Sequence, residues 1–486
     1  MIHRIFFFLL IVFLPTQLGL HFWPEWSYVL GRRIDFLSPT LFLSDIFLLL
    51  TCVSWSISWI RSQYTISNHQ YPTWKKKNLY LFISSFFLFF IFIYFNCVNA
   101  SSRSVAVYSW VKFFEYLLLF FYIVKTKPSI HLLSIGLTIG VLYSSGIAIG
   151  QFLLQHSLGG IFWYLGERTF TVDTPGIARF PLCLPSFLGC IELLRSYATF
   201  PHPNVLAGYL AVGIPIALQY QKSKIKNQIY KFQNEKIDAW LNGLQKIAIV
   251  LGLVALLVTF SRSAILMVVI FGLFSVVKVF YFDRFRHMNT EKISNLKNQR
   301  SKIQIKYQKV FGTIRNSLLG ICTLLFVIPL CIVGLYVLRS VSPFDESVVV
   351  REELVASALK LFQSAPLFGI GLGNFIVRLP DVLTAHAVYF LQPVHNIYIL
   401  LLTEVGVVGV AGFVVFVLLF AKSIKGLVLS IKGIKLQSVC YPLLTILVLG
   451  LVDHYWLTLQ QGQLLLTVIL GYVLVSMKDQ VLGERY

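Results

Sequence analysis

Charged side chains are scarce in this sequence. Only 13% of the 486 residues are Asp, Glu, Lys or Arg, about half of what a soluble globular protein carries. Acidic residues are the scarcest, at 20 against 41 basic ones, while 57% of the residues are hydrophobic and the mean hydropathy is +0.76. So little charge beside so much apolar surface excludes both a disordered chain and a set of water-soluble domains.

Cysteine is sparse as well. The seven cysteines form no C-x-x-C pair and no zinc-ligand spacing, which excludes a disulfide scaffold and a zinc ribbon. Only Cys183 and Cys190 fall in a long loop, where a disulfide is allowed although no pattern indicates one.

Long apolar runs occupy most of the chain. A spanning helix needs about 20 predominantly apolar residues. We therefore predict an all-α polytopic membrane protein, a single integral membrane domain over 1–486 with about 12 transmembrane helices. The predicted spans are 5–22, 41–60, 78–97, 105–125, 131–153, 204–220, 245–260, 263–282, 317–338, 397–421, 438–452 and 463–477. The first is the weakest because Pro15 interrupts it; a signal peptide is the alternative, but no small-residue cleavage pattern follows.

The basic residues orient these spans. Of the 41, 28 fall on one side of the predicted membrane and 11 on the other. By the positive-inside rule the richer side is the cytoplasm, which receives both termini and the basic loop 283–316. The long loops 154–203 and 339–396 then face outward, the second between spans nine and ten. Topology thus accounts for the basic excess, and we expect no nucleic-acid partner.

The outward side collects a set of polar residues that could carry chemistry. The three residues 260–262 form a very short outward turn, so Arg262 is either a snorkelling arginine or a ligand for an anion. The other candidates lie in the two long loops and at the outer ends of spans. They are Arg195, His202, Asn204, Arg351, Asn374, His395, Asn396, Glu404, Asp453 and His454.

Several of these residues also have a purely structural interpretation. The His395-Asn396 pair at a helix start is typical of a helix cap. Glu404 lies about 13 Å along its helix by the rise per residue, where a carboxylate is either functional or paired. Lys112 and Glu115, at i and i+3 in one span, are predicted to pair.

Neither a metal nor a cofactor is expected. His386, His395 and His454 could combine with Asp453, but no two of these histidines have the i,i+4 spacing of a helical metal site. The nearest acidic pair is Glu352-Glu353, and the glycines of 369–373 lack the strand and helix of a dinucleotide loop.

Four motifs resemble those of the O-antigen ligase and polymerase superfamily. His395-Asn396 precedes Gly406-x-x-Gly409 by nine residues, and Arg262 precedes Leu266 in an Arg-x-x-x-Leu element. Segments 199–208 and 366–375 are similar to the superfamily's entry to a central span and to the segment before its histidine. The order of these motifs and their shared outward side carry the resemblance, over roughly residues 195–465.

The resemblance implies a GT-C-like glycosyltransferase of the bacterial cytoplasmic membrane. It would take glycan from an undecaprenyl-diphosphate carrier and pass it to a hydroxyl of a lipid, glycan or protein acceptor. His395 would be the base, with Arg262 and Arg351 also catalytic and Arg195, His202, Asn204, Asn374, Asn396, Glu404 and His454 binding substrate. Arginines suit a diphosphate leaving group because the guanidinium supplies planar, charged, bidentate donors, so no metal is needed.

Three functions remain open at this point. Overall resemblance favours a ligase, but the motifs do not distinguish a ligase from a polymerase or a protein O-oligosaccharyltransferase. A transporter of lipid-linked glycan or a small anion would place its polar residues near the bilayer midplane, often in inverted repeats, and neither pattern is found here. A structural scaffold would not need Arg262, Arg351 and His395 on one face.

Overall fold

The computed structural model describes residues 2–65, 76–183, 190–218, 235–273, 346–383, 391–422 and 434–483. The chain divides into two compact units, one formed by Met1–Thr259 with Pro343–Tyr486 and the other by Phe260–Ser342. The helices of the first unit are α1 (Ile2–Val12), α2 (Leu43–Thr65), α3 (Lys76–Val98), α4 (Arg103–Thr126), α5 (Ile130–Leu154), α6 (Pro203–Ala217), α8 (Glu235–Val258), α11 (Glu346–Ser364), α12 (Phe375–Arg378), α13 (Ile397–Lys422), α14 (Ile434–Leu449), α15 (Tyr455–Thr458) and α16 (Gln460–Gly483).

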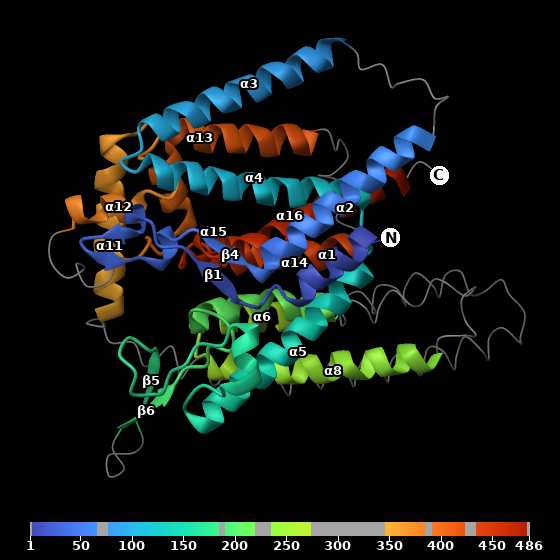
Figure 1. Ribbon diagram of the computed structural model, residues 1–486. Coiled ribbons are helices and arrows are strands. Elements are labelled where there is room, and N and C mark those ends of the chain that lie inside the picture. Colours follow the sequence, from blue (N-terminus) through green and yellow to red (C-terminus); the bar gives the residue numbers. More distant parts are fainter. Residues whose placement is uncertain are drawn as a thin grey trace, which may run out of the picture. The chain divides into compact units, whose positions relative to one another are not determined.

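The long helices of this unit pack along one another. α4 packs on α16, α16 on α14, and α14 on α6, which meets α5 and α8. α11 instead runs across one end of the long helices (Figure 1). α1 begins and α16 ends toward the opposite end (Figure 1). The short helices, strands and connecting loops thus gather at the end that α11 crosses.

The apolar helices agree with the predicted polytopic membrane protein. Five described helices are long and apolar enough to cross a membrane: Leu43–Ser62, Arg103–Thr126, Ile130–Leu154, Trp240–Val258 and Ile397–Val415. Six shorter apolar helices coincide with six further predicted spans: Ile2–Val12, Phe87–Val98, Pro203–Ala217, Arg262–Leu273, Cys440–Leu449 and Gln460–Ser476. The predicted span 317–338 and the basic loop 283–316 lie outside the described residues, so the count of twelve stays a prediction.

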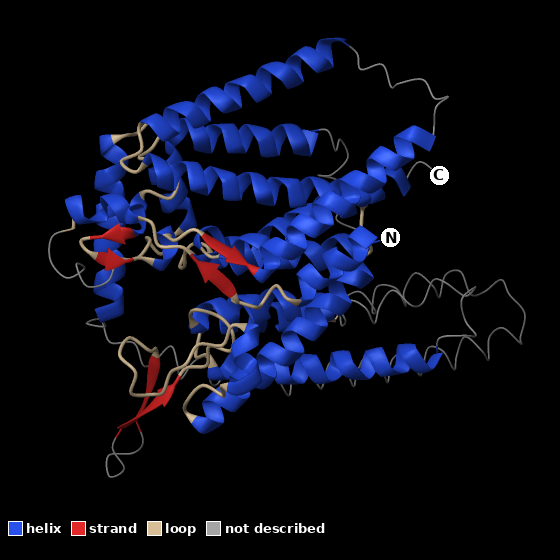
Figure 2. Cartoon of the chain, in the orientation of Figure 1, coloured by secondary structure: helices blue, strands red, loops and turns tan. Residues whose placement is uncertain are grey.

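Three small antiparallel ladders connect the helices, and Figure 2 shows them in red. Their strands are β1 (Gly19–His21) with β4 (Thr40–Phe42), β2 (Tyr28–Val29) with β3 (Arg32–Arg33), and β5 (Arg179–Cys183) with β6 (Cys190–Leu194). Cys183 lies opposite Cys190 in the backbone register of the last ladder, and Cys190 is disulfide-bonded.

The ends of the helices follow from local residues. α1 ends at Val12, three residues before Pro15, whose ring cannot continue a helix. α4 begins after Ser102, whose side chain accepts a hydrogen bond from the Val105 amide. α13 is kinked at Gly406, where φ is 65°, a left-handed conformation that glycine adopts without strain.

A hydrophobic core lies beneath α11. Leu354, Ala358 and Leu361 of α11 are fully buried in it, at the i, i+4, i+7 spacing of a single helix face. The remaining buried members come from segment 29–37, from Val105 of α4, from segment 370–379 and from segment 391–400. This packing fixes α11, and with it Arg351, against the chain that leads into α13.

The second unit is described here over residues 260–273. Phe260 has a φ of 51°, and Arg262 begins the apolar helix Arg262–Leu273. The Ile265 amide donates to the Ser261 carbonyl at 3.0 Å, which closes the first turn of that helix.

Candidate functional site

The segment that leads into α6 holds three of the predicted residues. The His202 side chain caps the helix by accepting from the Asn204 amide at 3.2 Å, and Pro203 occupies the first helical position. Arg195 donates through Nη2 to Asn204 Oδ1 at 2.7 Å and through Nε to the Thr259 carbonyl at 2.8 Å. Arg195 therefore orients the Asn204 amide.

Asn204 joins this segment to the turn that follows α14. Its Nδ2 donates to Asp453 Oδ2 at 3.0 Å, and the His454 amide donates to Asp453 Oδ1 at 2.9 Å. Asp453 is only 8% exposed, so both carboxylate oxygens are held by donors away from bulk water. A line of hydrogen bonds thus runs from Arg195 through Asn204 to Asp453.

His395 completes this group from the other side. Its ring lies edge-to-face with the ring of His454, with centroids 5.0 Å apart and an angle of 79° between them. One ligand-type atom each from His395, Asp453 and His454 lie within 4.8 Å of one another. We call these three residues the histidine cluster.

The two rings of the histidine cluster differ in their partners. His454 Nδ1 lies 2.6 Å from Thr458 Oγ1, one turn along α15, and Phe36 packs edge-on against the ring. His395 Nδ1 is buried and has no hydrogen-bond partner among the described residues. An unpaired buried ring nitrogen is costly, so it is a natural contact for a ligand.

Electrostatics keep both rings neutral. Burial is the main reason that the pKa values of His395 and His454 lie well below the ordinary 6.5, because charging a ring away from water is unfavourable. The neighbouring His454 lowers the pKa of His395 further, and Asp453 acts in the opposite direction. The positive charge of Arg351 makes a smaller contribution that lowers the pKa of both rings. Arg351 is thus close enough to the histidine cluster to act on it electrostatically.

Asn396 is a helix cap that positions its neighbour His395. Its Oδ1 accepts from the amides of Tyr398 and Ile399 at 3.0 and 3.1 Å, and its Nδ2 donates to the Leu451 carbonyl at 3.1 Å. The start of α13 is thereby tied to the chain just before Asp453. These bonds hold His395 and His454 side by side although 58 residues separate them in the sequence.

Asn374 and Glu404 belong to a different polar group. Glu404 Oε1 accepts from the Phe375 amide at 3.2 Å, and Asn374 Oδ1 accepts from the Ser102 amide at 2.8 Å. Beside them, the amides of Val407 and Val408 donate to carbonyls of 366–367 at the α13 kink. Their hydrogen bonds shape the loop 366–375, and none that the structure describes reaches the histidine cluster.

Arg262 lies in the second unit, where it is the first residue of its helix. The structure thus brings Arg195, Asn204, Asp453, His454 and His395 into one group of contacts, with His202 capping the same segment and Arg351 nearby. His386 lies outside the described residues.

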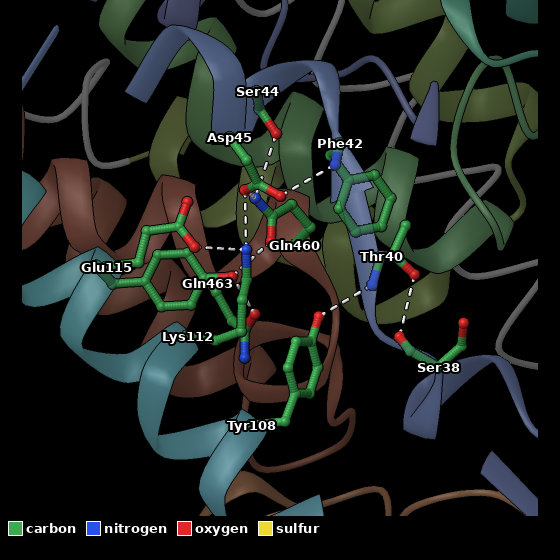
Figure 3. Close-up of polar contacts among 11 residues, drawn as sticks. Ser38, Thr40, Phe42, Ser44, Asp45, Tyr108, Lys112, Glu115, Gln460 and Gln463 are labelled. Carbon is green, nitrogen blue, oxygen red and sulfur yellow. Dashed lines mark hydrogen bonds and ion pairs between the residues drawn. The ribbon is translucent and has the colours of Figure 1, made fainter. Parts of the chain in front are cut away.

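The sequence predicted only one ion pair of a second buried polar cluster. Lys112 Nζ contacts Glu115 Oε2 at 2.6 Å, which confirms the predicted pair, and also Asp45 Oδ1 at 2.8 Å (Figure 3). Gln460 donates to Asp45 and accepts from Tyr116. We call Asp45, Lys112, Glu115 and Gln460 the lysine cluster. The missed partner Asp45 could have been suspected as a carboxylate in the first turn of an apolar helix.

Together the fold and the site define a polytopic membrane protein with a partly buried histidine and arginine site at one end of its helices. Residues 247–414 match the domain family described as O-antigen ligase, the family that the motifs predicted. The domain implies membrane glycan transfer by an enzyme of the ligase and polymerase type. The match covers Arg262, Arg351, His395 and Glu404, while Arg195, Asn204 and His454 lie outside it. A search of the curated proteins finds no match.

Proposed function

We propose that this protein transfers glycan from an undecaprenyl-diphosphate carrier to an acceptor hydroxyl at the outer face of the bacterial cytoplasmic membrane, without a metal. The reaction would be of the O-antigen ligase type on a GT-C-like framework. The observation that carries the proposal is His395, which is neutral, has an unpaired buried ring nitrogen and lies within the electrostatic reach of Arg351.

The chemistry assigns one task to each charged group. The acceptor oxygen attacks the anomeric carbon, the bond from that carbon to the diphosphate oxygen breaks, and the anomeric configuration inverts. His395 takes the proton of the attacking hydroxyl. Arg351, together with Arg262 by its motif, neutralises the charge that develops on the departing lipid diphosphate.

The donor itself would prepare the base. In the free protein, burial, the neighbouring His454 and, to a smaller extent, Arg351 hold the pKa of His395 low, which keeps the ring neutral but makes it a weak base. A diphosphate bound at Arg351 brings negative charge beside the ring and compensates that arginine. The pKa of His395 then rises toward the working pH, where a general base is most effective.

The remaining candidates would support this site. Arg195 and Asn204 hold Asp453 through hydrogen bonds, His202 caps the start of α6, and Asn396 fixes the start of α13 at His395. Asn374 and Glu404 would act by shaping the loop 366–375 below it. These roles concern the geometry of the substrate-binding end and require no direct contact with the sugar.

The outward orientation of this end has independent support. Cys190, at the β5–β6 hairpin, is disulfide-bonded, and disulfides persist in oxidising compartments outside the cytoplasm. Reporter fusions test this: fusions within 283–316 should report cytoplasm, and fusions within 339–396 should report the outside. The reverse pattern would place the histidine cluster in the cytoplasm and overturn the proposal.

The acceptor decides among ligase, polymerase and protein O-oligosaccharyltransferase. Purified protein would be incubated with lipid-linked oligosaccharide and, separately, with a glycolipid core, a second lipid-linked glycan and a hydroxyl-bearing peptide. We expect sugar on the glycolipid core. Transfer only to the second glycan or to the peptide would identify the polymerase or the protein-modifying alternative. Movement of intact donor across vesicles without transfer would favour a transporter.

A further inference from the structure

The histidine cluster has the composition of a transition-metal site. It offers two imidazoles and one carboxylate, with one ligand atom of each within 4.8 Å of the others. Imidazole nitrogen favours zinc and its neighbours over magnesium or calcium, and three protein ligands leave one coordination position for water. In a tetrahedral zinc site the ligand atoms lie about 3.3 Å apart, so the three ligand atoms must approach one another by up to about 1.5 Å.

Neighbouring residues already orient two of the three ligands. His454 Nδ1 bonds to Thr458 Oγ1 at 2.6 Å, which leaves Nε2 as the nitrogen for a metal. Asp453 is held by Asn204 and by the His454 amide. Zinc ligands are commonly fixed by such outer hydrogen bonds, which set the tautomer and the direction of the lone pair. The third ligand, His395, has a buried Nδ1 with no hydrogen-bond partner among the described residues.

We propose that His395, Asp453 and His454 bind a divalent transition-metal ion of the zinc type, and that this ion inhibits glycan transfer. The binding is inferred from the geometry, while the inhibition rests on the proposed function of His395. A neutral imidazole has one nitrogen lone pair, so a metal-bound His395 cannot also accept the acceptor's proton. The ion would therefore block the base and is not needed for the reaction.

The positive charge of Arg351 limits the affinity of the histidine cluster for a metal ion. Its positive charge acts on both histidines and opposes a second cation there. We therefore expect binding that chelators reverse readily. Arg351→Met should bind the metal more tightly than the natural protein, which is the opposite of its expected effect on the anionic donor.

The test titrates full-length protein, stripped with EDTA, with Co²⁺ as a visible-absorption probe and with Zn²⁺ by calorimetry. We expect one ion per chain and at least about tenfold weaker binding in His454→Gln and Asp453→Asn. Thr458→Val removes only the outer partner of His454, and should weaken binding by about 10–100-fold. His156→Gln, at an exposed histidine of the 154–203 loop, is the matched control and should bind like the natural protein.

Transfer assays then separate the two parts of the proposal. EDTA should leave transfer intact or raise it, and added Zn²⁺ should inhibit where Mg²⁺ does not. Absence of a Co²⁺ spectrum, or equal binding by His454→Gln and the natural protein, would overturn the metal site. Metal binding that stimulates transfer would overturn its inhibitory role. If binding is normal but His395→Ala transfers at full rate, the metal site stands and the proposed base is wrong.

Discussion

The histidine cluster and the lysine cluster are both buried polar groups in an apolar protein, but they satisfy their charges in different ways. In the lysine cluster, one ammonium contacts two carboxylates, and all the groups come from α2, α4 and α16. In the histidine cluster the rings are uncharged, one ring nitrogen has no described partner, and an arginine lies nearby. A cluster built on ion pairs and hydrogen bonds between three helices holds those helices together, whereas two neutral rings beside an arginine are suited to a ligand.

The largest effect that would sharpen this comparison is on turnover. His395→Ala should lower the rate of transfer by about 10²–10⁴-fold, the usual contribution of a general base. The affinity for lipid diphosphate and the free energy of unfolding should change little, because the donor is held by arginines. Steady-state rates and donor binding would be measured in the same variant. Equal loss of both would make His395 a donor ligand, and an unchanged rate would leave it a structural residue.

The lysine cluster should show the opposite pattern. Lys112→Met leaves Asp45 and Glu115 without their cation, and should lower the free energy of unfolding by about 3–5 kcal/mol. Turnover per folded molecule should stay close to that of the natural protein. The control carries Asp45→Asn and Glu115→Gln together with Lys112→Met, and should recover most of the stability because no buried charge is then unpaired. Denaturation in detergent measures the free energy of unfolding of the single and the triple variant. An unaltered unfolding midpoint in the single variant would contradict the pairing argument.

A smaller effect is expected at the arginine beside the histidine cluster. Arg351→Lys keeps the charge but loses the planar fork, so kcat/KM should fall by roughly 10–100-fold, as expected for the loss of one charge-assisted hydrogen bond. Arg262→Lys should behave alike. The matched control is Arg378→Lys, at a half-buried arginine paired with Asp381 at 2.7 Å, which should retain full activity. Full activity in both Arg351→Lys and Arg262→Lys would exclude a bidentate diphosphate contact.

The smallest expected effect is a displacement along the pH axis. Because the pKa of His395 is lowered in the free protein, kcat/KM should hold as pH falls through 6.5 and decline only below it. Bound diphosphate raises that pKa, so the acid limb of kcat should lie at higher pH than the limb of kcat/KM. Coincident limbs in the natural protein would mean that the donor does not act on this ring.

The same pKa shifts fix the sign of an effect on stability. Below pH 6.5 the histidines of the unfolded chain take up protons that the buried rings of the folded protein do not. Their contribution is therefore complete above 6.5 and is lost as pH falls toward the lowered values. His454→Gln should flatten this acid decline in melting temperature, whereas His156→Gln should not.

Sequence patterns alone predicted the membrane class, the apolar helices and the match of residues 247–414 to O-antigen ligase. Each depends on local properties: a run of apolar side chains must leave water wherever it lies, and motifs are contiguous residues. The pair Lys112–Glu115 was likewise predictable because i,i+3 residues meet on any helix.

Which distant residues meet depends on the tertiary structure alone. Packing of α14 and α15 beside the start of α13 brings Asp453 and His454 to His395, and packing of α2 and α16 on α4 brings Asp45 and Gln460 to Lys112. Helical spacing cannot reveal such contacts, because they arise between elements whose neighbours are chosen by the shape of the whole apolar surface.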